Sequence, residues 1–149
     1  MGDSVTPTRA LGIDYGKKRI GMALSDPTNT VASPLDTIVR RAGKRPPLKL
    51  LAEIAASHDV GQLVVGLPIG LDGEENEWCA EVRAVAVRLA ERIAVPVAFI
   101  DERLTSVRAE RAVRSSGLSK AARKQKGRVD AAAAQLILQA WLDNPGTAR

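Results

Sequence analysis

The apolar positions of the chain predict several short strands. The run 10–14 (ALGID) ends at an acid, and the run 19–25 (RIGMALS) resumes after a turn that contains Gly16, which together predict a hairpin. A third strand is expected near Asp36 to Val39. Two further runs, 62–66 (QLVVG) and 97–101 (VAFID), are short and rich in apolar residues, as is typical of buried strands.

Helical spacing is strongest between the last two of these strands. There Trp78, Val82, Val85, Leu89 and Ile93 recur at steps of four, three, four and four, which places them on one face of a helix. An earlier helix is expected after two prolines that suit a first turn, and its apolar stripe comprises Leu50, Leu51, Ile54 and Ala55.

The C-terminal third has a less regular pattern. A helix is predicted over Thr105 to Ser116, ending before Gly117, and a last helix over Val129 to Leu142. The basic segment Ser119 to Arg128 between them has little apolar pattern and is expected to be a mobile loop. The resulting order of elements predicts a mixed α/β fold with helices packed on a central sheet.

Composition limits the chain to one domain and a few kinds of chemistry. With 149 residues it has room for one hydrophobic core, which we place at residues 10–142 between tails at 1–9 and 143–149. One cysteine excludes an internal disulfide or a cysteine-based zinc site, and one histidine excludes an HExxH site. No apolar run is long enough to span a membrane, so we expect a cytoplasmic protein.

Charge is unevenly distributed along the chain. The formal net charge is +5, yet residues 103–128 alone hold nine bases and a single acid, Glu110. Segregation of this kind favours a polyanionic partner such as a nucleic acid, although solvated loops would also explain it. Aromatic residues make up only 3%, which counts against a surface that reads unpaired bases mainly by stacking.

Four acids stand where apolar elements begin or end. Asp14 ends the first expected strand, Asp101 and Glu102 end the last one, and Asp130 lies on the apolar stripe of the final helix. Each has a structural alternative, since Asp14 suits a turn, Asp101 or Glu102 a helix cap, and Asp130 a helix dipole. If the strands are neighbours, the carboxylates converge instead and suit Mg²⁺ or Mn²⁺. Two such ions about 4 Å apart can promote hydrolysis of a phosphodiester.

Four ordered motifs resemble the YqgF (RuvX) family of RNase H-like nucleases. They are LGIDYGKKRIGMALSD at 11–26, VVGLP with a following Asp-Gly at 64–73, DERLTS at 101–106, and RKQKGRVDAAAA with a following ILQ at 123–139. The resemblance extends over about residues 10–142. It implies an RNase H-like mixed five-stranded sheet flanked by helices, and a metal-dependent nuclease site built from acids.

The same resemblance implies roles for individual residues. Asp14 matches the acid of the first strand and Asp130 that of the last helix, while the middle acid is either Asp101 or Glu102. Strand alternation would send these two neighbours to opposite faces, so only one should enter the site. Arg19 and Arg103 match basic positions of the motifs. We expect the nucleic acid to be held by Lys17, Lys18, Arg19, Arg103, Arg114, Lys120, Arg123, Lys124, Lys126 and Arg128.

Three classes of function remain open at this point. Family members are linked to maturation of the 5′ end of pre-16S rRNA, and were earlier proposed as Holliday junction resolvases, so the substrate is a structured rRNA precursor or branched DNA. A non-catalytic nucleic-acid-binding module would need only the basic segments. A phosphotransferase is suggested by Asp14 and its following glycines, but one lobe of this size cannot form a nucleotide cleft. The sequence does not define the oligomeric state, and a homodimer is compatible with it.

Overall fold

A computed structural model describes residues 8–41, 45–105 and 120–149, with side chains in the last range described from residue 131. Six strands form one sheet, in which β1 (Arg9–Tyr15) is central. It pairs antiparallel with β2 (Arg19–Ser25) and parallel with β5 (Val60–Leu67), and β5 pairs parallel with β6 (Val97–Asp101). The expected hairpin, the two later strands and the mixed sheet are therefore confirmed.

The outer edge of the sheet beside β2 is divided into two short strands. Both β3 (Ala32–Pro34) and β4 (Ile38–Val39) pair antiparallel with β2, one at each end of it. The expected third strand corresponds to β4, and β3 was not anticipated. The sheet thus has the five expected positions, the outermost of which is filled by two separate strands. Pro34 ends β3, because proline cannot donate to a strand ladder.

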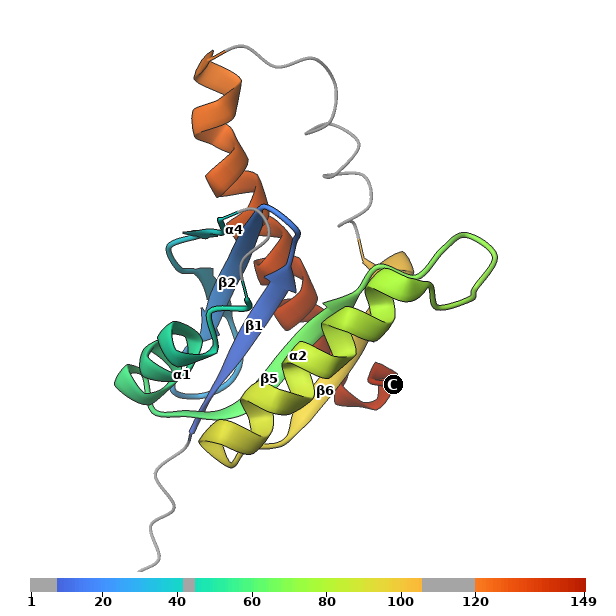
Figure 1. Cartoon of the computed structure of the whole chain (residues 1–149). Helices are drawn as coiled ribbons and strands as arrows, with labels where there is room; N and C mark the ends of the chain where they lie inside the picture. The colour runs from blue at the N-terminus through green and yellow to red at the C-terminus, as the bar shows by residue number, and fades with distance from the viewer. Residues whose placement is uncertain (1–7, 42–44, 106–119) are drawn as a thin grey trace, which may run out of the picture.

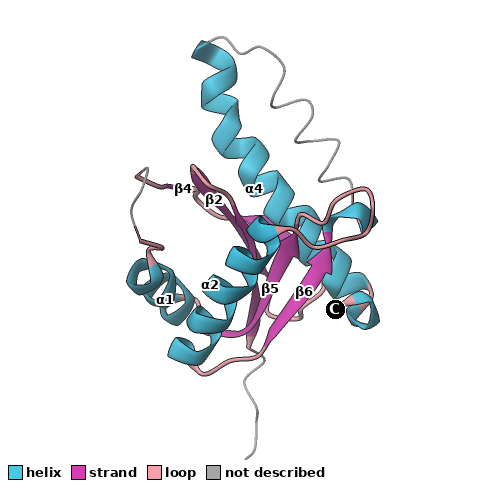
Figure 2. Ribbon diagram, turned by 45° about the vertical axis from the view of Figure 1, so that its right-hand side comes forward, coloured by secondary structure: helices cyan, strands magenta, loops and turns pink. Residues whose placement is uncertain are grey.

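Helices cover both faces of the sheet (Figures 1 and 2). On one face lie α1 (Leu48–Ser57) and α2 (Glu77–Ile93), and on the other lies α4 (Lys120–Asp143). Helix α2 is capped at its N-terminus by Asn76, whose side chain accepts a hydrogen bond from the Cys79 N–H, and at its C-terminus by Ala94 in a left-handed conformation. In α1 the buried positions are Leu48, Leu51 and Ala55, so the expected stripe is shifted and Leu50 is exposed.

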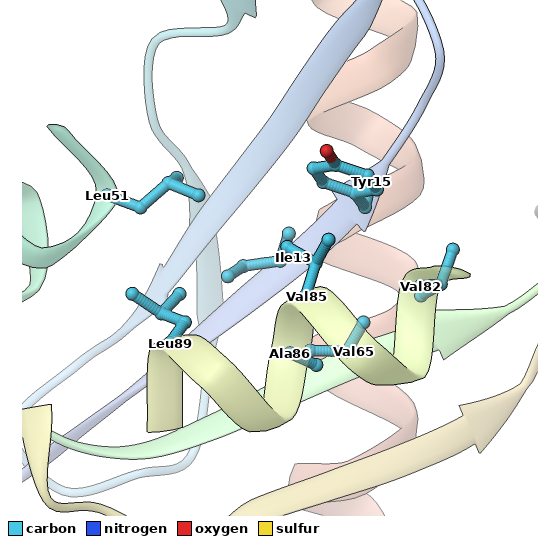
Figure 3. A pocket seen from close by; sticks show the side chains of 8 residues that line it. All are labelled: Ile13, Tyr15, Leu51, Val65, Val82, Val85, Ala86 and Leu89. Carbon is cyan, nitrogen blue, oxygen red and sulfur yellow. The ribbon is translucent and has the colours of Figure 1, made fainter. Parts of the chain in front are cut away.

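The larger core lies between the sheet and the pair α1 and α2. Figure 3 shows side chains of β1, β5 and both helices pointing into the space between these elements. A cavity of about 10 Å³ remains there, which is no more than the volume of one water-sized sphere. The core is therefore packed with almost no empty space. The cavity is lined by Ile13, Tyr15, Leu51, Val65, Val82, Val85, Ala86 and Leu89.

Helix α4 lies unusually close to the sheet at two glycines. A Cβ built on Gly12 of β1 would stand 2.6 Å from Leu138 Cβ, and one on Gly66 of β5 would stand 2.4 Å from Ile137 Cδ1. A side chain at position 12 would collide with backbone atoms of α4, whereas one at position 66 would displace the side chains of Ile137 and Glu102, because real contacts of this kind are longer than 3 Å. Gly12 therefore lets the backbone of α4 approach β1 closely, and Gly66 leaves room for the side chains of Ile137 and Glu102 above β5.

One sequence expectation is wrong and others lie outside the described residues. Residues 120–128, expected as a mobile loop, form the first part of α4. Apart from Gly127, this segment consists of residues with high or moderate helix propensity, so it needs no apolar stripe to be helical. Apart from Thr105, the helix expected over Thr105 to Ser116 lies in the part of the chain that the structure does not describe, as do residues 1–7 of the N-terminal tail.

The C-terminal segment 143–149, expected as a tail, returns to the sheet. After the short helix η2 (Pro145–Thr147), the N–H of Arg149 donates to the carbonyl of Phe99 at 2.8 Å. Phe99 belongs to the edge strand β6, so this contact occupies part of an otherwise unpaired edge. Among the described helices, none is long and apolar enough to cross a membrane.

Candidate active site

Three parallel strands end at one edge of the sheet. Because β1, β5 and β6 run in the same direction, their carboxyl ends lie side by side, and Asp14 and Asp101 stand at this edge. Both carboxylates are almost completely buried, as is that of Glu102, which follows β6 in the short helix η1 (Glu102–Leu104). Burying several acids together is costly unless each has a hydrogen-bond or ionic partner.

Strand alternation places Asp14 on the face covered by α4. Two residues before it, Gly12 lies against Leu138, and two residues before that, Ala10 packs in the α4 core. The intervening residues Ile13 and Tyr15 pack toward α1 and α2. Successive side chains of a strand point to opposite faces, so Asp14 shares the α4 face with Ala10 and Gly12.

Asp101 lies on the opposite face and is bound by a basic side chain. Phe99, two residues before it, packs in the core of α1 and α2. The guanidinium of Arg103 donates to both carboxylate oxygens of Asp101, with Nη2 at 2.6 Å from Oδ2 and Nε at 3.1 Å from Oδ1. The Arg103 N–H also donates to Oδ1 at 2.9 Å, and Arg149 Nη1 lies 3.4 Å from Oδ2. These hydrogen bonds from Arg103 hold the pKa of the Asp101 carboxyl below its usual value.

Asp101 thus acts as a cap. Its side chain accepts from the Arg103 N–H in the first turn of η1, which is the structural alternative considered for this position. Its carboxylate is already committed to Arg103, and it does not share a face with Asp14.

Glu102 points back over the sheet on the α4 side. A Cβ built on Gly66 of β5 would stand 2.9 Å from Glu102 Oε1 and 2.4 Å from Ile137 Cδ1 of α4. In the register of the sheet, Gly66 pairs with Ile100, and Ile13 pairs with Val65, so Gly66 stands between β6 and Asp14. The Glu102 carboxylate therefore lies over Gly66 of β5, on the strand between the one that carries Asp14 and β6.

Asp130 belongs to α4, the helix that covers this face of the sheet. It precedes Ala134 by one turn of α4, and the Ala134 carbonyl oxygen lies 2.9 Å from the position of a Gly12 Cβ. Toward its N-terminus, α4 projects beyond the side of the sheet at which β1 ends and β2 begins (Figure 1). The side chain of Asp130 lies outside the described residues, as do those of Lys120, Arg123, Lys124, Lys126 and Arg128 on the same helix; Arg114 lies outside them altogether.

The predicted basic residues that are described lie at the same edge. Lys17 and Lys18 form the exposed turn between β1 and β2, and Arg19 begins β2. Arg103 reaches the loop before α2, where its Nη1 lies 3.2 Å from the position of a Gly73 Cβ. Gly73 has φ +82°, a conformation that favours glycine, so the loop can approach the guanidinium closely.

Sequence reasoning missed Gly66, the glycine beside which the Glu102 carboxylate lies. The signal was present, because a glycine inside an apolar strand often marks a close approach of another element. Arg40 and Trp78 at the end of β1 were also missed as parts of this edge. In the described part of the chain, which contains the side chains of Asp14 and Glu102 but not that of Asp130, no group of three His, Cys, Asp or Glu residues is arranged to hold a metal.

The chain is similar to several named proteins over nearly its whole length. It is 45% identical over 135 residues to a protein of Anaeromyxobacter sp. (strain K), covering 91% of this chain and 96% of the other. It is 39% identical to a protein of Maridesulfovibrio salexigens, covering 90% and 97% of the two chains. Both relatives carry the name "Putative pre-16S rRNA nuclease".

Solved structures share its fold at low sequence identity. Thermus thermophilus RuvC matches with a TM-score of 0.57 and 15% identity, covering 95% of this chain and 99% of that one. The same protein in complex with a Holliday junction substrate matches with a TM-score of 0.56. The RuvC likeness establishes the RNase H-like fold. Residues 8–144 match the model of the RuvX family, described as Holliday junction resolvase, and the chain belongs to that family.

Proposed function

We propose that this protein is a metal-dependent endonuclease that hydrolyses phosphodiester bonds, with 5′-end processing of pre-16S rRNA as its role. The observation that supports the proposal is the placement of Asp14 and Glu102. Both are buried on the α4 face of the sheet. The strand that separates β1 from β6 is β5, and its Gly66 has no side chain on this face. The names of relatives that are 39–45% identical favour precursor rRNA as the substrate.

The donor set fits a hard divalent cation. Buried carboxylate oxygens are ligands that Mg²⁺ and Mn²⁺ prefer, and Asp14 and Glu102 offer two such groups on one face. We propose that Asp130 of α4 supplies the third. When bound, a pair of such ions would lower the pKa of water and stabilise the leaving oxygen of a phosphodiester. The protein then needs no nucleophile of its own.

In this proposal Asp101 is a positioning residue. Its two carboxylate oxygens fix the guanidinium of Arg103, and the loop at Gly73 confines the guanidinium from another side. A bidentate ion pair holds a planar guanidinium in one orientation, which suits contact with a phosphate at the rim. Glu102, which faces the other way, is the middle acid of the site.

Backbone phosphates would be held by the cations on either side of these acids. Lys17, Lys18 and Arg19 follow Asp14, and the helical segment 120–128 precedes Asp130. Contacts of this kind are independent of base sequence and strengthen binding at low salt. Action on precursor rRNA would place the protein in the cytoplasm.

The proposal is tested by cleavage of two substrates with Mg²⁺ and with Mn²⁺. One is a 5′-extended 16S rRNA precursor, and the other is a four-way DNA junction of matched length. Asp14→Asn and Glu102→Gln should each slow cleavage of the preferred substrate by about 100-fold or more, and Asp130→Asn should do the same. Preferential cleavage of the junction would show a resolvase instead. If the unaltered protein cuts neither substrate with either metal, the enzyme proposal is wrong and a binding module remains.

A further inference from the structure

Two of the four aromatic residues of the chain stack on one another beside the candidate active site. The rings of Tyr15 and Trp78 are 5.7 Å apart with planes inclined by 18°. Tyr15 directly follows Asp14 on β1 but faces the opposite side of the sheet, and Trp78 belongs to the first turn of α2. Tyr15 is buried, whereas Trp78 is partly exposed at this edge.

Cations cover both rings of this pair. The guanidinium carbon of Arg40 lies 4.6 Å from the centre of the Tyr15 ring, and Lys17 Nζ lies 5.2 Å from the centre of the Trp78 ring. Such contacts are favourable in themselves, so they also have a purely structural explanation. They nevertheless gather two cations and an accessible indole around Tyr15, the residue that follows Asp14 on β1.

Arg40 makes the turn between β1 and β2 rigid. Its backbone N–H donates to the Lys18 carbonyl at 2.8 Å, and its Nη1 donates to the Gly16 carbonyl at 2.9 Å. The Gly16 N–H in turn donates to the Arg19 carbonyl at 2.9 Å. The exposed Lys17 and Lys18 are therefore presented from a fixed backbone, which lowers the entropy lost when they bind a ligand.

The balance of charge here is positive. Within the described residues, Lys17, Lys18 and Arg40 have no carboxylate within ion-pair distance. Two acids oppose them from α2, the exposed Glu77 and Glu81, and Glu81 is near enough to raise the pKa of Tyr15, although burial raises it more. Three cations against two acids, with an indole between them, suit a single phosphodiester strand more than a neutral ligand.

We propose that Lys17, Lys18, Arg40 and Trp78 form a binding site for a single-stranded segment of nucleic acid that adjoins the cleaved bond. The inference rests on the proposed function, because it assigns this segment to the nuclease substrate. The cations hold consecutive phosphates, and an unpaired base stacks on the Trp78 ring. The flexible Lys17 side chain, which covers this ring in the free protein, moves to a phosphate when the base binds. Low aromatic content does not oppose this, since one accessible indole is enough for one base.

Binding of a short oligouridylate, measured in EDTA so that no cleavage occurs, tests the site directly. In a Trp141→Phe background, Trp78 is the only indole, and stacking of a base should quench its fluorescence. Trp78→Leu should weaken binding about tenfold, which is typical for the loss of one stacked base. A fully paired duplex of the same length should be bound without the quenching.

Charge variants separate this site from general electrostatic attraction. Lys17→Gln and Lys18→Gln change exposed side chains, and each should reduce the slope of log K against log salt by about 0.7. Glu81→Gln should tighten binding about twofold by removing one of the two opposing charges. The matched controls are Arg88→Gln and Glu91→Gln, exposed positions farther along α2, which should change neither the affinity nor the quenching.

The possible results distinguish this inference from the proposed function. Quenching by the oligonucleotide with a weakened Trp78→Leu variant supports the site even if neither substrate is ever cleaved. Unchanged affinity in Trp78→Leu, together with a lower unfolding midpoint, would show that the aromatic pair only stabilises the fold. Equal responses to duplex and single strand would likewise overturn the inference, even for an active nuclease.

Discussion

The carboxylate of Glu102 occupies the space that a side chain at position 66 would fill. Its Oε1 lies 2.9 Å from the position of a Gly66 Cβ, so the glycine of β5 admits the acid that follows β6. Asp101, its neighbour in sequence, instead pairs with Arg103 on the other side of the sheet. A glycine on an adjacent strand therefore gives the Glu102 carboxylate, the proposed middle acid of the site, its space on the α4 face.

Gly66→Ala should impair catalysis more than stability. The added methyl would stand 2.4 Å from Ile137 Cδ1 and 2.9 Å from Glu102 Oε1, so both side chains must move. Overpacking of this kind costs about 1–3 kcal/mol. A displacement of about 1 Å at a reacting group can cost about 100-fold in rate, so we expect kcat to fall by that factor.

Steady-state cleavage and thermal unfolding measure the two effects separately. Gly146→Ala is the matched control, because its Cβ would meet only Asn144 Oδ1, at 3.2 Å. A Gly66→Ala enzyme that retains full kcat would show that Glu102 is not held at a reacting position.

Glu102→Gln and Asp101→Asn should have different kinetic effects. Loss of the Glu102 charge removes a proposed metal ligand, so kcat should fall by about 10²–10³. Loss of the Asp101 charge loosens Arg103 but leaves the acids on the α4 face intact, so KM should rise while kcat stays within about tenfold. Measuring both constants for both variants checks this, and the reverse pattern would make Asp101 the ligand.

The pairing of Asp101 with Arg103 should make stability depend on pH at the acid end. Because the pKa of folded Asp101 lies below its unfolded value, its contribution is fully present above the unfolded pKa, near 4. The contribution is lost as the pH falls through the lower, folded pKa. The free energy of unfolding of the parent should therefore exceed that of Asp101→Asn by a constant amount from pH 5 to 8.

Urea unfolding at intervals of half a pH unit from pH 3 to 8 would follow this difference. We expect it to shrink steadily below about pH 4. A difference that is independent of pH down to pH 3 would mean that the ion pair contributes nothing beyond packing.

Much of the fold was predictable because its strands are short apolar runs with clear boundaries. The predicted strand 97–101 coincides with β6, and the apolar spacing from Trp78 to Ile93 predicted α2 almost to the residue. Helix 120–128 was missed, because a helix that has no regular apolar stripe shows little hydrophobic periodicity. Strand β3 was missed because three residues are too few for any period.

The site was only partly predictable for a different reason. Spacing along the chain located the acids at the ends of elements, and alternation required that Asp101 and Glu102 separate. The choice of which acid, Asp101 or Glu102, lies on the same face as Asp14 depends on the pairing of β5 with β6 and on the space at Gly66. Both are contacts between segments distant in the sequence. The roles of Asp14, Glu102 and Asp130 stay predictions until the variants are assayed.

The basic first part of α4 should contribute to nucleic-acid binding in proportion to its charge. If Arg123 and Lys124 each neutralise one phosphate of a duplex, the double variant Arg123→Gln/Lys124→Gln should reduce the slope of log K against log salt by about 1.8. Its control is Lys49→Gln/Arg92→Gln, which removes the same charge from exposed positions of α1 and α2 at the opposite edge of the sheet. Titration of a duplex with the Glu102→Gln protein at four salt concentrations measures both slopes without cleavage. Equal slopes for the two double variants would mean that binding follows net charge alone, and that the helix before Asp130 has no special position on the substrate.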